Sequence, residues 1–183
     1  MEEFIQLKIL KFFLENPYEE VYLRELSKKL KLSPSAIKKY LDMLFKENLI
    51  LEERKANLRY FKANLDNLFF KHLKIAFSIN LIEKSGFIKL LKENIPNISS
   101  IILFGSIAKG EDNKESDIDI LVIGKEKKLN LIKFEEKIGK NINIHIFTWS
   151  EWNKKAKEDS PFYYESVIYG IPLYGELPIV KKV

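Results

Sequence analysis

Two aspartates, two residues apart within an apolar run, are the residues of this sequence best suited to chemistry. Asp117 and Asp119 stand in DIDILVI, residues 117–123. Aspartate is a poor strand residue and is costly to bury as a charge. Side chains alternate along a strand, so both carboxylates should share one face while Ile118 and Ile120 point to the core. Two neighbouring carboxylates repel unless a cation lies between them, and their oxygens suit Mg²⁺, so we expect a magnesium site.

A Gly-Ser pair follows the preceding apolar run. Residues 98–104 read ISSIILF, the pattern of a buried strand, and Gly105 and Ser106 end it. Glycine permits close approach of the backbone, and the serine hydroxyl and following amides can hold phosphate oxygens at the start of a helical turn. Lys109, one turn later, adds positive charge. These residues predict a phosphate site near the carboxylates. The alternative is a tight turn followed by a solvated strand end.

The spacing of these residues resembles that of a known enzyme family. Ten residues separate Ser106 from Asp117, giving G-S-x10-D-x-D between two apolar strands. From about residue 98 to 148, the sequence resembles the minimal nucleotidyltransferases of the DNA polymerase β-like superfamily. The resemblance implies two Mg²⁺ ions on the aspartates, a nucleoside triphosphate held by Gly105, Ser106 and Lys109, and nucleotidyl transfer to an acceptor. Family members often carry arginine where this chain has Lys109, which offers only a point charge.

A third catalytic acid, which active members of that superfamily carry on a neighbouring strand, is not evident. The matching segment, KNINIHIFT at residues 140–148, has no Asp or Glu. Asn143 and His145 share one face of this predicted strand, and one of them should take the third position. Asparagine can offer an oxygen to a metal but cannot act as a base, whereas histidine can be a base near neutral pH. Glu151, beyond the strand, could also reach in. Both active transfer and nucleotide binding without catalysis remain open.

The N-terminal residues show a different pattern, three helices followed by a hairpin. The strongest start signal is Ser33, a predicted cap, followed by Pro34 and the apolar stripe Ile37, Leu41 and Leu44. Two short strands around a polar turn near residues 55–57 come next. Over residues 1–65 this pattern resembles the winged helix-turn-helix domain of small archaeal and bacterial DNA-binding regulators.

Six polar residues of this region are candidates for contact with double-stranded DNA. Three should face outward from the third helix and three lie at the hairpin: Ser35, Lys38, Lys39, Arg54, Lys55 and Arg59. In winged-helix proteins these surfaces meet the major groove and the phosphate backbone. The alternative is that they are solvated charges and that the hairpin serves packing.

The predicted fold class is α+β, with a winged helix at residues 1–65, linking helices at 66–97 and a small mixed α/β nucleotidyltransferase-like domain at 98–183. Asp66 is a candidate cap for the first linking helix, whose apolar stripe should pack between domains or across a homodimer. This stripe comprises Leu68, Phe69, Leu73, Ala76, Phe77 and Leu81. The tail is aromatic, and its rings should cover the sheet or, alternatively, stack on a base or partner: Trp149, Trp152, Phe162, Tyr163 and Tyr169.

Composition limits the class of protein and its location. The 183 residues include no cysteine, which excludes disulfides, thiolate metal sites and thiol catalysis. No uncharged apolar run approaches the roughly 20 residues that a membrane span needs, and the acidic start does not resemble a signal peptide. We therefore expect a cytoplasmic protein that does not bind membranes. The net charge of +5 is too small to indicate nucleic acid by itself.

Three functional hypotheses follow. By resemblance, such nucleotidyltransferases often modify or neutralise a partner protein, commonly as the antitoxin half of a toxin–antitoxin pair, so a small helical toxin-like partner is expected. The second hypothesis is a DNA-binding regulator whose second domain senses nucleotide without catalysis. The third is a protein–protein module that has lost both activities.

Overall fold

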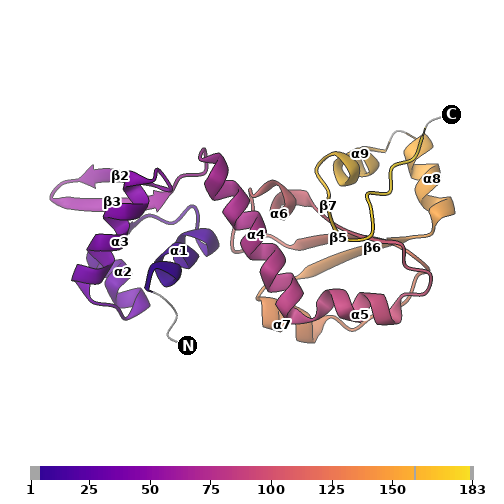
Figure 1. The fold of residues 1–183 in the computed structure, drawn as a ribbon, viewed down its shortest axis with the longest axis horizontal. Coiled ribbons are helices and arrows are strands. Elements are labelled where there is room, and N and C mark those ends of the chain that lie inside the picture. Colours follow the sequence, from indigo (N-terminus) through magenta and orange to yellow (C-terminus); the bar gives the residue numbers. More distant parts are fainter. Residues whose placement is uncertain (1–4, 159, 182–183) are drawn as a thin grey trace. The chain divides into compact units, whose positions relative to one another are not determined.

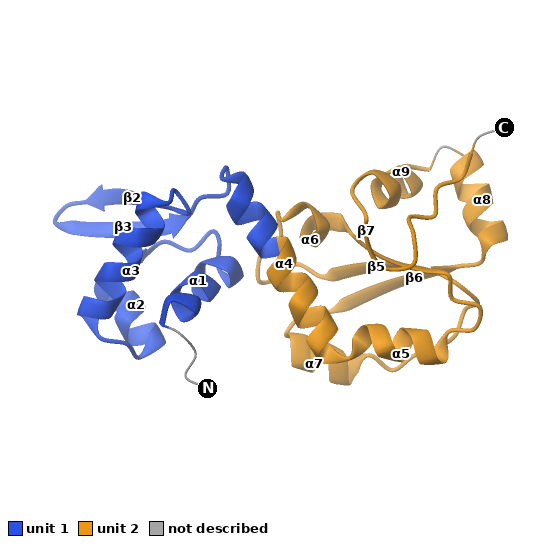
Figure 2. Cartoon of the chain, viewed as in Figure 1, with its two compact units in different colours: residues 1–74 blue, residues 75–183 orange. Residues whose placement is uncertain are grey.

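The chain divides into two compact units in the computed structural model, which describes residues 5–158 and 160–181. The units are residues 1–74 and 75–183 (Figure 2), and the division falls within helix α4 (Leu68–Ser85). Each unit contains a separate sheet. The predicted α+β class is confirmed.

The first unit is a three-helix domain with a small antiparallel sheet (Figure 1). Its elements are α1 (Ile5–Glu15), β1 (Val21–Tyr22), α2 (Leu23–Leu30), α3 (Pro34–Lys46), β2 (Ile50–Lys55) and β3 (Leu58–Ala63). The strand order is β1-β3-β2, so β2 and β3 form the predicted hairpin. As predicted, the Ser33 hydroxyl accepts a hydrogen bond from the Ala36 amide at 3.3 Å and caps α3. The stripe of Ile37, Leu41 and Leu44 is buried.

One prediction for α4, the Asp66 cap, is wrong. The Asn67 carboxamide oxygen, not the Asp66 carboxylate, accepts the hydrogen bond from the Phe70 amide at 3.0 Å. The side chains of Leu68 and Phe69 are 69% and 62% exposed, whereas that of Phe70 is fully buried. Apolar residues surround most of this helix, so the spacing of its leucines does not select the buried side.

The second unit is built on a four-stranded mixed sheet. Its helices after α4 are α5 (Phe87–Asn94), α6 (Gly105–Lys109), α7 (Ile132–Ile138), α8 (Trp149–Lys157) and α9 (Pro161–Ile168). Its strands are β4 (Ser100–Phe104), β5 (Ile118–Ile123), β6 (Ile142–Phe147) and β7 (Ile171–Tyr174), in the order β6-β5-β4-β7. β5 and β6 are parallel, while β4 is antiparallel to both β5 and β7. β7 was not predicted.

Both faces of this sheet are covered, which explains the apolar runs in its strands. One face contributes Ile118 and Ile120 to a core that includes Phe87 and Leu91 of α5. The other face packs against α8 and α9 through a group of buried side chains: Ile102, Leu121, Ile123, Trp152 and Tyr163. Figure 1 shows α5 and α7 on one side of the sheet and α8 and α9 on the other.

The aromatic tail covers the sheet only in part. Trp152, Tyr163 and Phe162 pack in the core beneath α8 and α9, as predicted. Trp149 and Tyr169 do not, because their side chains are 45% and 53% exposed. No helix in the described part of the chain is both long and apolar enough to cross a membrane.

Candidate functional site

The two aspartates lie at the start of the central strand β5. Asp117 immediately precedes the strand and Asp119 is its second residue. In the sheet register Asp119 pairs with Phe104 at the end of β4 and with Asn143 on β6. The strand pairing therefore places the turn that begins at Gly105 on one side of Asp119 and Asn143 on the other.

Gly105 allows the turn after β4 to lie directly against the Asp119 carboxylate. Its φ angle is +74°, in the left-handed region that favours glycine. A Cβ atom added to Gly105 would overlap the Asp119 Oδ2 atom and lie 3.2 Å from Cγ. Any larger residue would displace either the turn or the carboxylate.

The Asn143 side chain bridges the two carboxylates, and Asn141 binds one of them. The Asn143 amide nitrogen donates to Asp117 Oδ2 at 3.3 Å and to Asp119 Oδ1 at 3.2 Å. The Asn141 amide nitrogen donates to Asp117 Oδ1 at 3.0 Å. These bonds satisfy carboxylate oxygens that would otherwise only repel one another. The contact of Asn141 with Asp117 was not predicted. A single asparagine just before a predicted strand has the same sequence pattern as a turn residue.

The sheet register distinguishes the two candidates for the third position. Asn143 is opposite Asp119, whereas His145 is opposite Leu121, one pair further along. The His145 ring packs against Phe104 and Phe162, with ring centroids 5.8 Å and 5.0 Å away. The structure brings Asn143, not His145, to the two carboxylates, because side chains two residues apart on a strand lie about 7 Å apart.

The other acid considered for the site, Glu151, caps helix α8. Its Oε2 accepts hydrogen bonds from the Thr148 amide and hydroxyl, both at 2.8 Å, and Thr148 Oγ1 accepts one from the Glu151 amide. The bond from the Thr148 backbone lowers the pKa of the Glu151 carboxyl. This capping box holds the carboxylate at the helix start, so the expectation that it reaches the aspartates is not met.

Lys109, at the end of α6, contacts residues of the C-terminal helix α9 and the turn after it. Its Nζ donates to Glu165 Oε1 at 2.7 Å and lies 4.8 Å from the centre of the Tyr169 ring. The hydrogen bond to Glu165 raises the pKa of the lysine. The side chains are 29% and 43% exposed, so this pair is open to solvent and contributes little stability. Glu165 was not predicted, since it lies 56 residues away in sequence.

The donor atoms of this site are those that a hard divalent cation accepts. Within the described residues, no group of three or more His, Cys, Asp or Glu side chains is close enough to hold a metal. Two carboxylates and one amide oxygen, with the remaining positions left to phosphate and water, match the usual environment of Mg²⁺. The residues present therefore fit a metal that is bound together with a phosphate ligand.

The candidate DNA-contacting residues of the first unit differ in their surroundings. Ser35, Lys38 and Lys39 are exposed on α3, on the side away from its buried stripe, as predicted. Lys55 is instead paired with Glu20 and Glu53, and the hydrogen bond to Glu20 raises its pKa.

Arg59 is also engaged within the first unit. Its guanidinium donates to Glu52 at 2.6 Å and to Asp42 of α3 at 2.8 Å, and its side chain is 33% exposed. Arg54 is 79% exposed and lies 3.6 Å from Glu52. The expected basic surface at the hairpin is therefore largely neutralised by acidic neighbours. Within the described residues, Lys38 and Lys39 of α3 form no ion pair, and Asp42 on the same helix is paired with Arg59.

Comparisons with known proteins match the two units separately. Residues 84–171 match the model of the nucleotidyltransferase domain, and residues 5–51 match that of the bacterial regulatory protein family arsR. The protein adenylyltransferase MntA of Shewanella oneidensis is 39% identical over 54 residues, which are 30% of this chain. The match spans 39% of the length of that relative.

Solved structures with a similar chain include two of toxin–antitoxin systems. A toxin–antitoxin crystal structure with AMP-PNP is 27% identical, with a TM-score of 0.37, over 49% of this chain and 71% of the other. A mutant of the toxin–antitoxin MntA–HpeT is 24% identical, with a TM-score of 0.35, over 51% and 72%. The two family matches confirm the predicted fusion: the chain joins an N-terminal helix-turn-helix domain to a nucleotidyltransferase domain.

Proposed function

We propose that the second unit transfers a nucleoside monophosphate from a nucleoside triphosphate to an acceptor hydroxyl. The observation that carries this proposal is the placement of Asp117, Asp119 and Asn143 beside the Gly105–Ser106 turn. The family match supports the class of reaction, because nucleotidyltransferase domains act on nucleoside triphosphates with a divalent metal.

Each residue has a distinct role in this proposal. Asp117 and Asp119 would hold two Mg²⁺ ions, and Asn143 would offer its carboxamide oxygen to one of them. Bound Mg²⁺ would neutralise the triphosphate and increase the electrophilicity of the α-phosphorus. Ser106 and Lys109 bind phosphate oxygens, and Gly105 leaves room for them beside Asp119. The attacking oxygen forms a bond to the α-phosphorus as pyrophosphate leaves.

The chain supplies no base at the third position, because an amide cannot accept the acceptor's proton. Solvent must therefore remove the proton, and catalysis should be slower than with a carboxylate there. Asn143 does not by itself prevent turnover, since general base catalysis contributes about 10²–10⁴ in rate and metal activation remains. We therefore propose a slow but active enzyme and not a nucleotide sensor without catalysis.

We further propose that ATP is the donor and that a protein is the acceptor. The relative from Shewanella oneidensis is named a protein adenylyltransferase, and its matched segment supports the same chemistry here. The product of the neighbouring reading frame, expected to be a small helical toxin-like protein, is the first acceptor to test.

The test is label transfer with the purified chain. ATP labelled at the α-phosphate should label the neighbouring gene product in the presence of Mg²⁺, whereas ATP labelled at the γ-phosphate should not. A double change, Asp117→Asn with Asp119→Asn, should abolish the transfer. Labelling that persists undiminished in this variant would refute the assignment of the two aspartates.

A second function, binding of double-stranded DNA through α3, is favoured by the exposed side chains of Ser35, Lys38 and Lys39. The helix-turn-helix family match supports it. Changing both lysines to alanine should weaken binding to duplex fragments from the genome and reduce the slope of log affinity against log salt by about 2, one for each lost phosphate contact. Unchanged affinity and slope would contradict this surface.

A further inference from the structure

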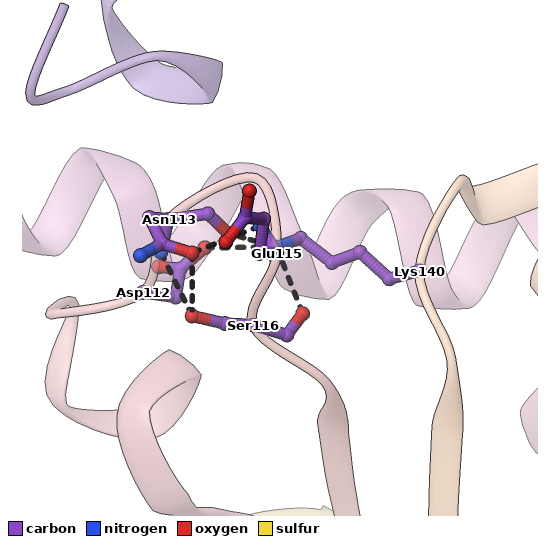
Figure 3. A network of polar contacts seen from close by, with 5 residues as sticks. All are labelled: Asp112, Asn113, Glu115, Ser116 and Lys140. Atoms are coloured by element: carbon purple, nitrogen blue, oxygen red, sulfur yellow. Dashed lines mark hydrogen bonds and ion pairs between the residues drawn. The ribbon is translucent and has the colours of Figure 1, made fainter.

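Lys140, between α7 and β6, joins the strand β6 to the loop that carries Asp117. Its ammonium donates to the carbonyl oxygens of Asn113 and Ser116, the second at 3.1 Å, and forms an ion pair of 3.5 Å with Asp112. Figure 3 shows this loop folded around the end of the lysine side chain. Lys140 therefore ties the x10 segment of the G-S-x10-D-x-D pattern to the neighbouring strand.

These contacts engage the lysine with the loop through both its hydrogen bonds and its charge. Two of the three N–H donors of an ammonium bond to backbone carbonyl oxygens, and the Asp112 carboxylate pairs with its charge. Its side chain is 16% exposed and that of Asp112 is 7% exposed. Lys140 is therefore held against the loop by two carbonyl oxygens and one buried carboxylate.

The loop itself is closed by short-range hydrogen bonds. The Asn113 amide donates to the Ser116 hydroxyl at 2.9 Å, and the Glu115 amide donates to the Asn113 carboxamide oxygen at 2.8 Å. This network ends at the residue immediately before Asp117 (Figure 3). Because the loop holds its shape internally, fixing it at Lys140 fixes the point from which the aspartate projects.

The residue next to Lys140 fixes the other side of Asp117. Asn141 donates from its side chain to Asp117 Oδ1, and its carbonyl oxygen accepts the Ile118 amide at 2.9 Å. Lys140 thus holds the backbone before Asp117. Asn141 holds the Asp117 carboxylate and the backbone after it.

We propose that Lys140 is a positioning residue for the metal-binding carboxylate of Asp117. The proposal rests on the proposed function for its consequence in catalysis, but its structural part does not. Partners that orient metal ligands from outside the coordination shell typically account for about 10–100-fold in metal affinity or activity. We expect Lys140→Met to weaken the binding of Mg²⁺ in the presence of nucleotide by about tenfold or more.

The chain offers a matched control in Lys137. This lysine of α7 also donates to two backbone carbonyl oxygens, those of Lys84 at 2.8 Å and Ser85 at 2.9 Å, away from the loop. Lys137→Met removes the same side chain and similar bonds without touching Asp117. Because Lys140→Met removes a cation from beside the buried Asp112 carboxylate, a double variant with Asp112→Asn as well guards against simple misfolding.

The first measurement is amide hydrogen exchange of the full chain without nucleotide or metal. In Lys140→Met and in the double variant, exchange should accelerate in the peptide spanning residues 111–118 and stay unchanged in the core strands. In Lys137→Met the same peptide should exchange as in the wild type. Unchanged exchange of the loop in both Lys140 variants would overturn the proposal, whatever the chain does with nucleotides.

The second measurement is titration of Mg²⁺ into the chain with a fixed concentration of a fluorescent, non-hydrolysable ATP analogue, with analogue binding as the readout. Both Lys140 variants should need about tenfold more Mg²⁺ than the wild type, and Lys137→Met should need the same amount as the wild type. Faster exchange of the loop with unaltered Mg²⁺ dependence would overturn the positioning role. If the wild type itself binds no nucleotide, the proposed function fails, while the exchange result still decides whether Lys140 holds the loop.

Discussion

The backbone of Gly105 lies directly against the carboxylate of Asp119. The contact arises because Phe104, the last residue of β4, is paired with Asp119 in the antiparallel register, so the chain turns away from the sheet at the carboxylate. With φ at +74° and no side chain, Gly105 brings the Ser106 turn next to the acid. A phosphate held by the turn would then lie close to a metal held by Asp119.

Gly105→Ala should therefore damage the site more than it damages the fold. The left-handed conformation costs an alanine about 1–2 kcal/mol, and the new Cβ must also displace Asp119. A shift of a reacting group by about 1 Å can reduce the rate about 10²-fold. The measurements are thermal unfolding and label transfer from ATP.

Gly86→Ala is the control, because Gly86 has φ at +86° with nothing within 4 Å of the added Cβ. It should show the same backbone cost and retain transfer. Equal loss of transfer in both variants would show that the contact with Asp119 is irrelevant to activity.

Asn143→Asp should increase the rate of transfer. The new carboxylate lies opposite Asp119 in the register and can both bind metal and accept the proton of the attacking hydroxyl. We expect an acceleration of about 10² at saturating Mg²⁺, the lower end of the range for general base catalysis. Without Mg²⁺ the variant should unfold at a lower temperature than the wild type, because three carboxylates then repel one another.

Asn141→Asp provides the comparison for this gain. It also introduces a carboxylate beside Asp117, but from the residue before β6 and not from the position opposite Asp119. It should not accelerate transfer. If Asn143→Asp is no faster than the wild type at any Mg²⁺ concentration, Asn143 does not occupy the third position.

Glu165→Gln should strengthen the binding of nucleoside triphosphate. Glu165 neutralises Lys109, and the triphosphate must compete with it for the ammonium. An exposed ion pair is worth at most about 1 kcal/mol, so the affinity should rise by no more than about fivefold. Titration with a fluorescent ATP analogue measures this, with Lys109→Ala as the variant that should weaken binding. Weaker binding by Glu165→Gln would mean that Glu165 orients Lys109 toward the phosphate.

Arg59→Ala should destabilise the first unit in a pH-dependent manner. The hydrogen bond from Arg59 lowers the pKa of Glu52 below its ordinary value of 4.5. A carboxyl whose folded pKa is depressed stabilises the fold above its unfolded pKa, and this stabilisation is lost as pH falls through the folded pKa. We expect Arg59→Ala to lower the free energy of unfolding by roughly 1–3 kcal/mol at pH 7. This loss should become smaller as the pH falls below the ordinary pKa of the Glu52 carboxyl.

Urea unfolding of the full chain at neutral and acidic pH measures this loss. Arg54→Ala, whose side chain is 79% exposed, should change the free energy of unfolding by less than about 0.5 kcal/mol. A loss for Arg59→Ala that is the same at both pH values would contradict the role of its pair with Glu52.

Local sequence signals predicted much of the fold and half of the site. The alternation around Asp117 and Asp119 predicted their shared face, and Ser33 with Pro34 predicted the start of α3, because both depend on neighbours in the chain. The strand β7 was missed: it is four residues long, contains Pro172 and follows an aromatic stretch that gave no alternation. Its pairing with β4 is set by the tertiary fold.

The rest of the site depends on distant partners that no local pattern encodes. Sequence spacing could not choose between Asn143 and His145, because only the register of β5 with β6 places one of them opposite Asp119. Similarly, the pairing of Arg59 with Asp42 and Glu52 joins residues 17 and 7 positions apart. A basic residue near a hairpin tip has the pattern of a DNA contact until its acidic neighbours are known.

The most direct test of the central claim is a calorimetric titration of the chain with a non-hydrolysable ATP analogue, with and without Mg²⁺. The wild type should bind the analogue in the presence of Mg²⁺ and lose most of that affinity when the metal is chelated. The variant with Asp117→Asn and Asp119→Asn should bind weakly in both conditions. Binding that is independent of Mg²⁺ and unaltered in this variant, or no binding of any nucleoside triphosphate analogue by the wild type, would contradict the claim that these two carboxylates hold metal and triphosphate together.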